Sequence, residues 1–228
     1  MATEPNHIAA RIGVAAVFVN VLAFVPFALV DDSYRPDLLE RWSFAVESRA
    51  VPVSVGAWLF AIGALLLIPW AAGLTRSLGP YSWPGGALLV VGALVRMVGS
   101  LLPLVAARFV PHGELAIVTT LLGMTLVMEA LFHLCLGSGV LLVSLAMARH
   151  RRIPTWMPAS GLLTGLVALP VAGMVSSGPA AIFMPVADFL FLGWMSLTCL
   201  YLVGAWVPRE GTNPTRVPLP PAQPQPGT

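Results

Sequence analysis

Six apolar segments, each about 20 residues or longer, follow one another along the chain, and a helix of that length spans the hydrocarbon core of a bilayer. Within the hydrocarbon every backbone N–H and C=O must be hydrogen-bonded inside the protein. The segments lack the alternation that marks the strands of a membrane β-barrel. The sequence therefore predicts an all-α integral membrane protein, a bundle of six transmembrane helices. The predicted spans are 8–30, 51–75, 85–107, 115–148, 157–178 and 181–207.

The composition supports this class and excludes others. Hydrophobic residues make up 57% of the chain and charged residues 10%, whereas about a quarter of a soluble domain is charged. The chain has no lysine, which excludes a lysine Schiff base and a P-loop. A net charge of +2, spread evenly, predicts no nucleic-acid partner. Cys135 and Cys199 lie within apolar spans, where we expect them to pack as small core residues.

Arginines in the connecting segments predict the orientation, because cytoplasmic loops are enriched in basic residues. One side carries Arg11, Arg76, Arg149, Arg151, Arg152, Arg209 and Arg216. The arginines of the other side are fewer and are accompanied by acidic residues. We therefore predict that both termini are cytoplasmic.

Outside the spans, the first external loop is predicted to form a short amphipathic helix. Pro36 suits the first turn of a helix, and the apolar residues that follow repeat on one face. These residues are Leu38, Leu39, Trp42, Ala45 and Val46. We expect this helix to lie flat on the outer membrane surface as an anchor, and the alternative is a lid over an outward-facing cavity.

The chain is predicted to divide into two parts, a transmembrane domain over residues 1–207 and a cytoplasmic tail over 208–228. The tail is rich in proline and is expected to be disordered. Most tryptophans lie near predicted span ends, where aromatic rings favour the membrane interface. Those assigned to this belt are Trp58, Trp70, Trp83, Trp156 and Trp206. Trp194 lies deeper, and we expect it to pack in the core.

Arg96 stands near the middle of the third predicted span. Gly92, Arg96 and Gly99 follow the i, i+4, i+7 spacing of one helix face, and Gly85 and Pro103 extend that face. Glycine allows helices to approach closely, so this face is expected to pack against other helices. A charge at such depth is costly and is normally paired or exposed to a water-filled cavity.

Other spans offer candidate partners for this arginine. Glu129 and His133 lie four residues apart on one face of the fourth span, and Asp188 lies about two turns into the sixth span. Pro185 precedes Asp188 and is expected to loosen the local helix. Asn20 adds a neutral polar group in the first span. We expect Arg96 to face inward and to meet Asp188 or Glu129.

Each of these residues also has a structural interpretation. Arg96 can act as a clamp that gives the bundle packing specificity through Asp188 or Glu129. His133 can hydrogen-bond Glu129 or a backbone carbonyl. The Glu129–His133 pair offers two metal ligands, but a metal site needs a third or fourth, and His112 and His150 belong to loops. We therefore predict no metal and no cofactor.

Several stretches resemble the bacterial six-span family catalogued as domain of unknown function 4386. L-I-P-W-A-A-G-L-T-R-S-L-G is similar to its proline-then-L-x-R segment, and L-V-R-M-V-G to its R-V-x-E element, with Arg96 at the arginine. L-G-S-G-V-L-L-V-S-L-A-M-A-R-H-R-R-I-P-T-W-M-P-A-S-G-L resembles its turn between the fourth and fifth spans. M-P-V-A-D-F-L-F-L-G-W-M-S-L resembles P-x-x-x-E-x-x-L-x-x-W-L, with Asp188 at the acidic position.

The resemblance implies a six-helix integral protein of a bacterial inner membrane, and it implies no known activity. One departure bears on the site, because the glutamate that follows the third-span arginine in the family falls at Gly99 here. A local pairing on that helix is thereby lost, and Asp188 or Glu129 must take its place.

Three functional hypotheses remain open from the sequence. The preferred one is a binder or transporter of a lipid or small anionic molecule, which predicts a cavity reaching Arg96 and would suit a homodimer. The second is an intramembrane enzyme acting on a lipid or prenyl substrate, with Glu129 or Asp188 as general acid or base. The third is an accessory or scaffold subunit whose buried charges only specify packing.

Overall fold

The computed structural model describes residues 4–28, 38–150, 153–174 and 180–204, and this part of the chain is helical, without strands. The long helices are α1 Glu4–Ala28, α3 Ala50–Leu78, α4 Trp83–Phe109, α5 Leu115–Ala148, α6 Trp156–Met174 and α7 Ala180–Leu202. A shorter helix, α2 Leu38–Ser48, and the 3₁₀ turns η1 Pro80–Ser82 and η2 Val110–His112 connect them. All six long helices are long and apolar enough to cross a membrane, so the predicted class, an all-α six-span bundle, is confirmed.

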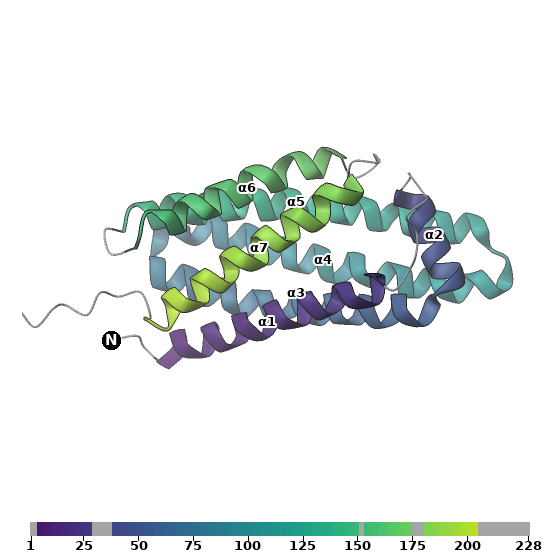
Figure 1. The fold of residues 1–228 in the computed structure, drawn as a ribbon, viewed down its shortest axis with the longest axis horizontal. Coiled ribbons are helices and arrows are strands. Elements are labelled where there is room, and N and C mark those ends of the chain that lie inside the picture. The colour runs from purple at the N-terminus through teal and green to yellow at the C-terminus, as the bar shows by residue number, and fades with distance from the viewer. Residues whose placement is uncertain (1–3, 29–37, 151–152, 175–179, 205–228) are drawn as a thin grey trace, which may run out of the picture.

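The six long helices form a closed ring. Each packs against the next in sequence order, and α7 returns to pack against α1. Successive helices run in opposite directions, which brings the start of α1 and the end of α7 to the same end of the bundle (Figure 1). Residues from all six helices share one main apolar core. A side chain on the inner face of any helix therefore meets side chains that are distant in sequence.

The observed helix ends agree with the predicted spans to within a few residues. The fourth span, 115–148, coincides with α5. At 1.5 Å per residue α5 is about 50 Å long, and the hairpin that it forms with α4 extends beyond the end of α1 (Figure 1). The tail 208–228, Trp206 and the predicted ends of the first, fifth and sixth spans (29–30, 175–178 and 205–207) lie outside the described residues.

A glycine face joins α4 to its neighbour α5, as the sequence predicts. Gly85, Gly92 and Gly99 are buried together with Arg96. A Cβ atom added at Gly85 would lie 2.8 Å from the carbonyl oxygen of Gly139 in α5. Only glycine permits this approach of two backbones, and the approach turns Arg96 inward.

The short helix α2 covers one end of the bundle. It runs crosswise to the long helices (Figure 1) and contacts α3, α4 and α5. Ala45 and Val46 are buried against Ala106 and Leu122 in a second, smaller apolar cluster. A helix is thus present where the sequence predicts one, and its apolar residues Ala45 and Val46 pack on protein at this end of the ring. Pro36 and the side chains of Leu38, Leu39 and Trp42 lie outside the described residues.

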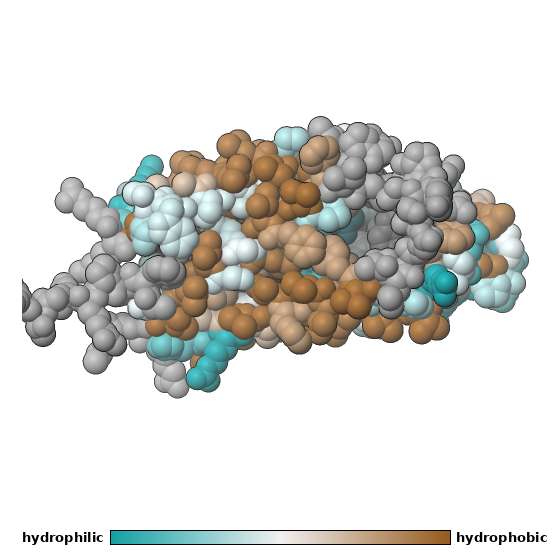
Figure 2. Space-filling view, in the orientation of Figure 1, coloured by the Kyte–Doolittle hydropathy of each residue, from teal (hydrophilic) through white to brown (hydrophobic). Residues whose placement is uncertain are grey.

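The outer surface carries apolar side chains along the middle of the bundle, visible as the brown band in Figure 2. Trp58, Trp83 and Trp156 are among the exposed large apolar residues. The prediction that Trp70 belongs to the interface belt is wrong, because its side chain is fully buried. The centre of its ring lies 6.0 Å from the centre of the Trp194 ring. Trp70 lies near the end of its helix, as a belt residue does, but it is on the side of that helix that faces the core.

Candidate functional site

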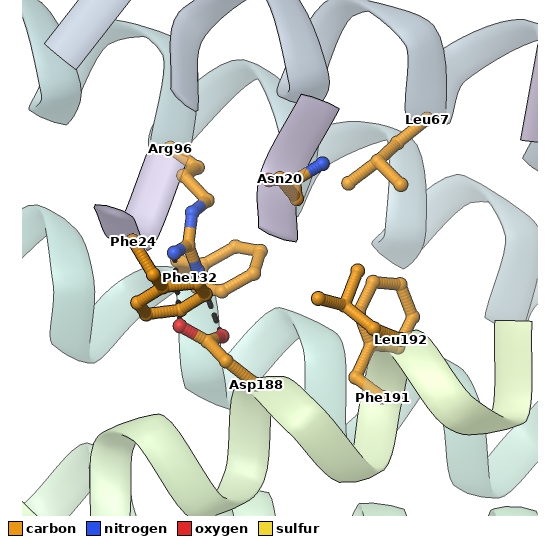
Figure 3. Close-up of a pocket in the computed structure, with 8 residues that line it drawn as sticks. All are labelled: Asn20, Phe24, Leu67, Arg96, Phe132, Asp188, Phe191 and Leu192. Atoms are coloured by element: carbon orange, nitrogen blue, oxygen red, sulfur yellow. Dashed lines mark hydrogen bonds and ion pairs between the residues drawn. The ribbon is translucent and has the colours of Figure 1, made fainter. Parts of the chain in front are cut away.

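Arg96 forms a buried ion pair with Asp188 at the centre of the bundle. It is the central residue of the 27-residue helix α4, so it lies midway between the two ends of that span. Its Nη1 donates to Oδ1 of Asp188 and its Nη2 to Oδ2, both at 2.9 Å (Figure 3). Two parallel bonds to one carboxylate are the strongest geometry that arginine offers. Of the two acidic partners that the sequence left open, Asp188 is the one that binds directly.

Two phenyl rings lie against the guanidinium. Its central carbon is 4.3 Å from the ring centre of Phe132 in α5 and 4.7 Å from that of Phe60 in α3. Desolvated contacts of this kind stabilise a cation by about 2 kcal/mol or more. Phe60 and Phe132 were missed from the sequence, because phenylalanine is common on every face of an apolar helix.

Glu129 and His133 complete the cluster from one face of α5. Oε2 of Glu129 lies 3.9 Å from Nη1 of Arg96, and Nε2 of His133 lies 3.7 Å from Oδ1 of Asp188. The side chain of His133 is fully buried and that of Glu129 is 13% exposed. The i, i+4 spacing places both on the side of α5 that faces α4 and α7. The structure thus brings all four predicted residues together.

The cluster contains polar atoms that have no hydrogen-bond partner among the described residues. They are Nε of Arg96, Oε2 of Glu129 and Nε2 of His133. Buried polar atoms are normally bonded, and each exception needs an explanation. The formal charges are also unequal, because one arginine faces two carboxylates. The cluster therefore differs from a fully satisfied structural ion pair.

A small cavity adjoins the ion pair. Its volume is about 10 Å³, and the residues labelled in Figure 3 line it from α1, α3, α4, α5 and α7. Such a space holds about one water molecule. Asn20 of α1 reaches the cavity because Gly63 of α3 leaves room: a Cβ atom there would lie 2.7 Å from Cγ of Asn20. The space beside Arg96 therefore has only the size of a water molecule, which is much smaller than the ligand cavity that the binder hypothesis predicts.

A larger hollow lies elsewhere and does not reach the cluster. It measures about 170 Å³ and lies between the first half of α1 and the end of α3, with Asn6 and Arg76 as its polar lining residues. None of the four predicted residues lines it. In the described part of the chain, no group of three or more His, Cys, Asp or Glu side chains is arranged to hold a metal ion.

Comparison with known proteins identifies no relative: no family model, no curated protein and no solved structure matches this chain. The site itself must therefore support any functional assignment. The coarse assignment follows from the helices: the chain is a multi-pass membrane protein with a charged cluster buried in its centre.

Proposed function

We propose that this protein binds or transports a small anionic molecule, a carboxylate or a lipid headgroup, with Arg96 as its anion-binding group. One observation carries the proposal. The guanidinium at the centre of the bundle already holds a carboxylate in bidentate geometry, and that carboxylate is the side chain of Asp188. A ligand carboxylate or phosphate presents the same two oxygens to arginine.

In this interpretation the described conformation is a closed state. The cavity beside Arg96 has a volume of about 10 Å³, so an anion can enter only when Asp188 leaves the guanidinium. The anion and Asp188 take turns as the partner of Arg96, so Arg96 is never left without a counter-ion. Exchange of this kind avoids the large cost of an unpaired buried charge.

Helix α7 is the element best suited to carry Asp188 away. It packs less extensively on α6 and α1 than α4 packs on α5. Pro185 lies inside α7, three residues before Asp188, and a proline within a helix removes a backbone hydrogen bond and favours a kink. Broken helices next to a midplane site are a recurrent feature of transporters.

The resemblance to the bacterial family of domain of unknown function 4386 is part of the same proposal, as are an inner-membrane location and cytoplasmic termini. The observed pairing fits the departure noted at Gly99, because Asp188 supplies the carboxylate that the third span lacks. The enzyme hypothesis, with Glu129 or Asp188 as general acid or base, has no observation of its own in its favour.

Native mass spectrometry of the protein in lipid nanodiscs tests the proposal. The wild type is compared with the double variant Arg96→Met/Asp188→Leu, which removes both charges and keeps apolar volume in their place. Arg149→Met is the matched control, since Arg149 is exposed and rests on Tyr81.

We expect the wild type and Arg149→Met to retain an anionic molecule that the folded double variant lacks, and its mass would identify the ligand class. If wild type and double variant carry the same molecules, or none, and support the same cell growth, the pair is a structural clamp and the proposal fails.

A further inference from the structure

The tautomer of His133 is determined by its hydrogen bond to the backbone. Nδ1 lies 2.8 Å from the carbonyl oxygen of Glu129, one turn earlier in α5. A carbonyl oxygen only accepts hydrogen bonds, so Nδ1 must carry the proton and donate it. A neutral His133 therefore has a bare lone pair on Nε2.

That lone pair would face a carboxylate. Nε2 lies 3.7 Å from Oδ1 of Asp188, and no donor among the described residues bonds to it. A lone pair and a carboxylate oxygen repel each other, whereas an N–H at the same place attracts. A charge-assisted N–H to oxygen bond is about 2.8 Å long, so a movement of about 1 Å would complete one.

The charges around His133 favour the same protonated form. Its titratable and charged neighbours are Glu129 on α5, Arg96 on α4 and Asp188 on α7. Helix α6, which also packs on α5, carries no ionisable residue, and the contributions nearest the cluster from α1 and α3, Asn20 and Phe60, are neutral. With both carboxylates ionised, the formal charge of the cluster is −1 when His133 is neutral and zero when it is an imidazolium.

We infer that His133 is a buried proton-binding site, in which a proton from water binds Nε2 and the resulting imidazolium faces Asp188. The role of this proton in transport rests on the proposed function. When an anion displaces Asp188 from Arg96, the freed carboxylate needs a new cation, and the imidazolium is the one nearest to it. The imidazolium can then serve as the counter-ion of Asp188 while Arg96 holds the anion.

Nitrogen-15 NMR of selectively labelled histidine tests the proton site directly. The chain has four histidines, and the variant His7→Gln/His112→Gln/His150→Gln leaves His133 as the single signal without a change in the core. Spectra are recorded in nanodiscs at neutral pH. Asp188→Asn is then added to remove the facing carboxylate, and Glu114→Gln, at the exposed start of α5, is the matched control.

We expect both ring nitrogens of His133 to carry a proton in the starting variant and in the Glu114→Gln control. We expect Asp188→Asn to return His133 to the neutral form, with a proton on Nδ1 alone. A neutral His133 in the starting variant, protonated only on Nδ1, would overturn the inference. That result would leave the anion proposal intact, because the mass-spectrometric test does not depend on His133.

Discussion

Replacing Arg96 by methionine should destabilise the bundle by about 3–5 kcal/mol, the usual cost of removing one partner of a buried ion pair. The substitution removes two hydrogen bonds of 2.9 Å, and bonds to charged groups contribute about 1.5–3 kcal/mol each. It leaves Asp188, whose side chain is 9% exposed, without its cation. Methionine keeps the apolar volume and its own contact with the phenyl rings, so most of the loss is electrostatic.

The double variant Arg96→Met/Asp188→Leu separates charge from packing. Removal of both charges should restore stability to within about 1–2 kcal/mol of the wild type, because buried ion pairs are often replaceable by apolar residues. Arg149→Met, an identical change at an exposed position, should shift stability by less than about 0.5 kcal/mol.

Unfolding in mixed detergent micelles, followed by tryptophan fluorescence, measures these differences. Two results would contradict these expectations. If Arg96→Met is as stable as the wild type, removal of the cation does not leave an unpaired buried carboxylate. If the double variant is as unstable as the single variant, the loss comes from packing.

Two further predictions concern the neighbours of the pair and the helix contacts. Glu129 lies 3.9 Å from the guanidinium and can replace Asp188 as its acceptor, so Asp188→Asn and Glu129→Gln should each be tolerated. The loss of stability in the double variant should exceed the sum of the two single losses by about 1–3 kcal/mol. The same unfolding assay measures this excess, and strictly additive losses would contradict the prediction. Gly85→Ala should lower stability by about 1–3 kcal/mol because its Cβ would meet the backbone of α5. Gly123→Ala, whose Cβ would meet open space, should leave the melting temperature unchanged. If the two variants have equal melting temperatures, α4 and α5 do not approach so closely.

Sequence periodicity was sufficient for the fold and for the inward face of α4. Apolar length set the spans, and the spacing of Gly92, Arg96 and Gly99 identified the packed face. Depth along the chain was also informative, because Asp188 and Glu129 lie at the level of Arg96. Which of the two binds it depends on how α7 crosses the ring, and no local pattern carries that information.

The aromatic contacts likewise could not be predicted from local sequence patterns. Trp70 was predicted at the interface from its distance to a span end, and its inward face follows only from packing against Trp194. Phe60 and Phe132 had no distinguishing signal. The water-sized volume beside Arg96 results from the side chains of five helices together, so it could not be predicted from any one of them.

Cysteine accessibility at Asn20 tests most directly whether water and anions reach Arg96. Asn20 lines the cavity and does not contribute to the ion pair, so Asn20→Cys leaves that pair in place. The native cysteines are replaced by alanine, and a control protein keeps Cys199, which is buried away from the cavity. Proteoliposomes are treated with an anionic or a cationic methanethiosulfonate of similar size, and labelling is followed by intact mass.

We expect the anionic reagent to modify Asn20→Cys several-fold faster than the cationic reagent and to leave Cys199 unmodified. The preference for the anion should disappear when Arg96→Met/Asp188→Leu is added. If neither reagent modifies Asn20→Cys until the protein unfolds, the centre of the bundle stays closed, and Arg96 serves only to hold the helices together.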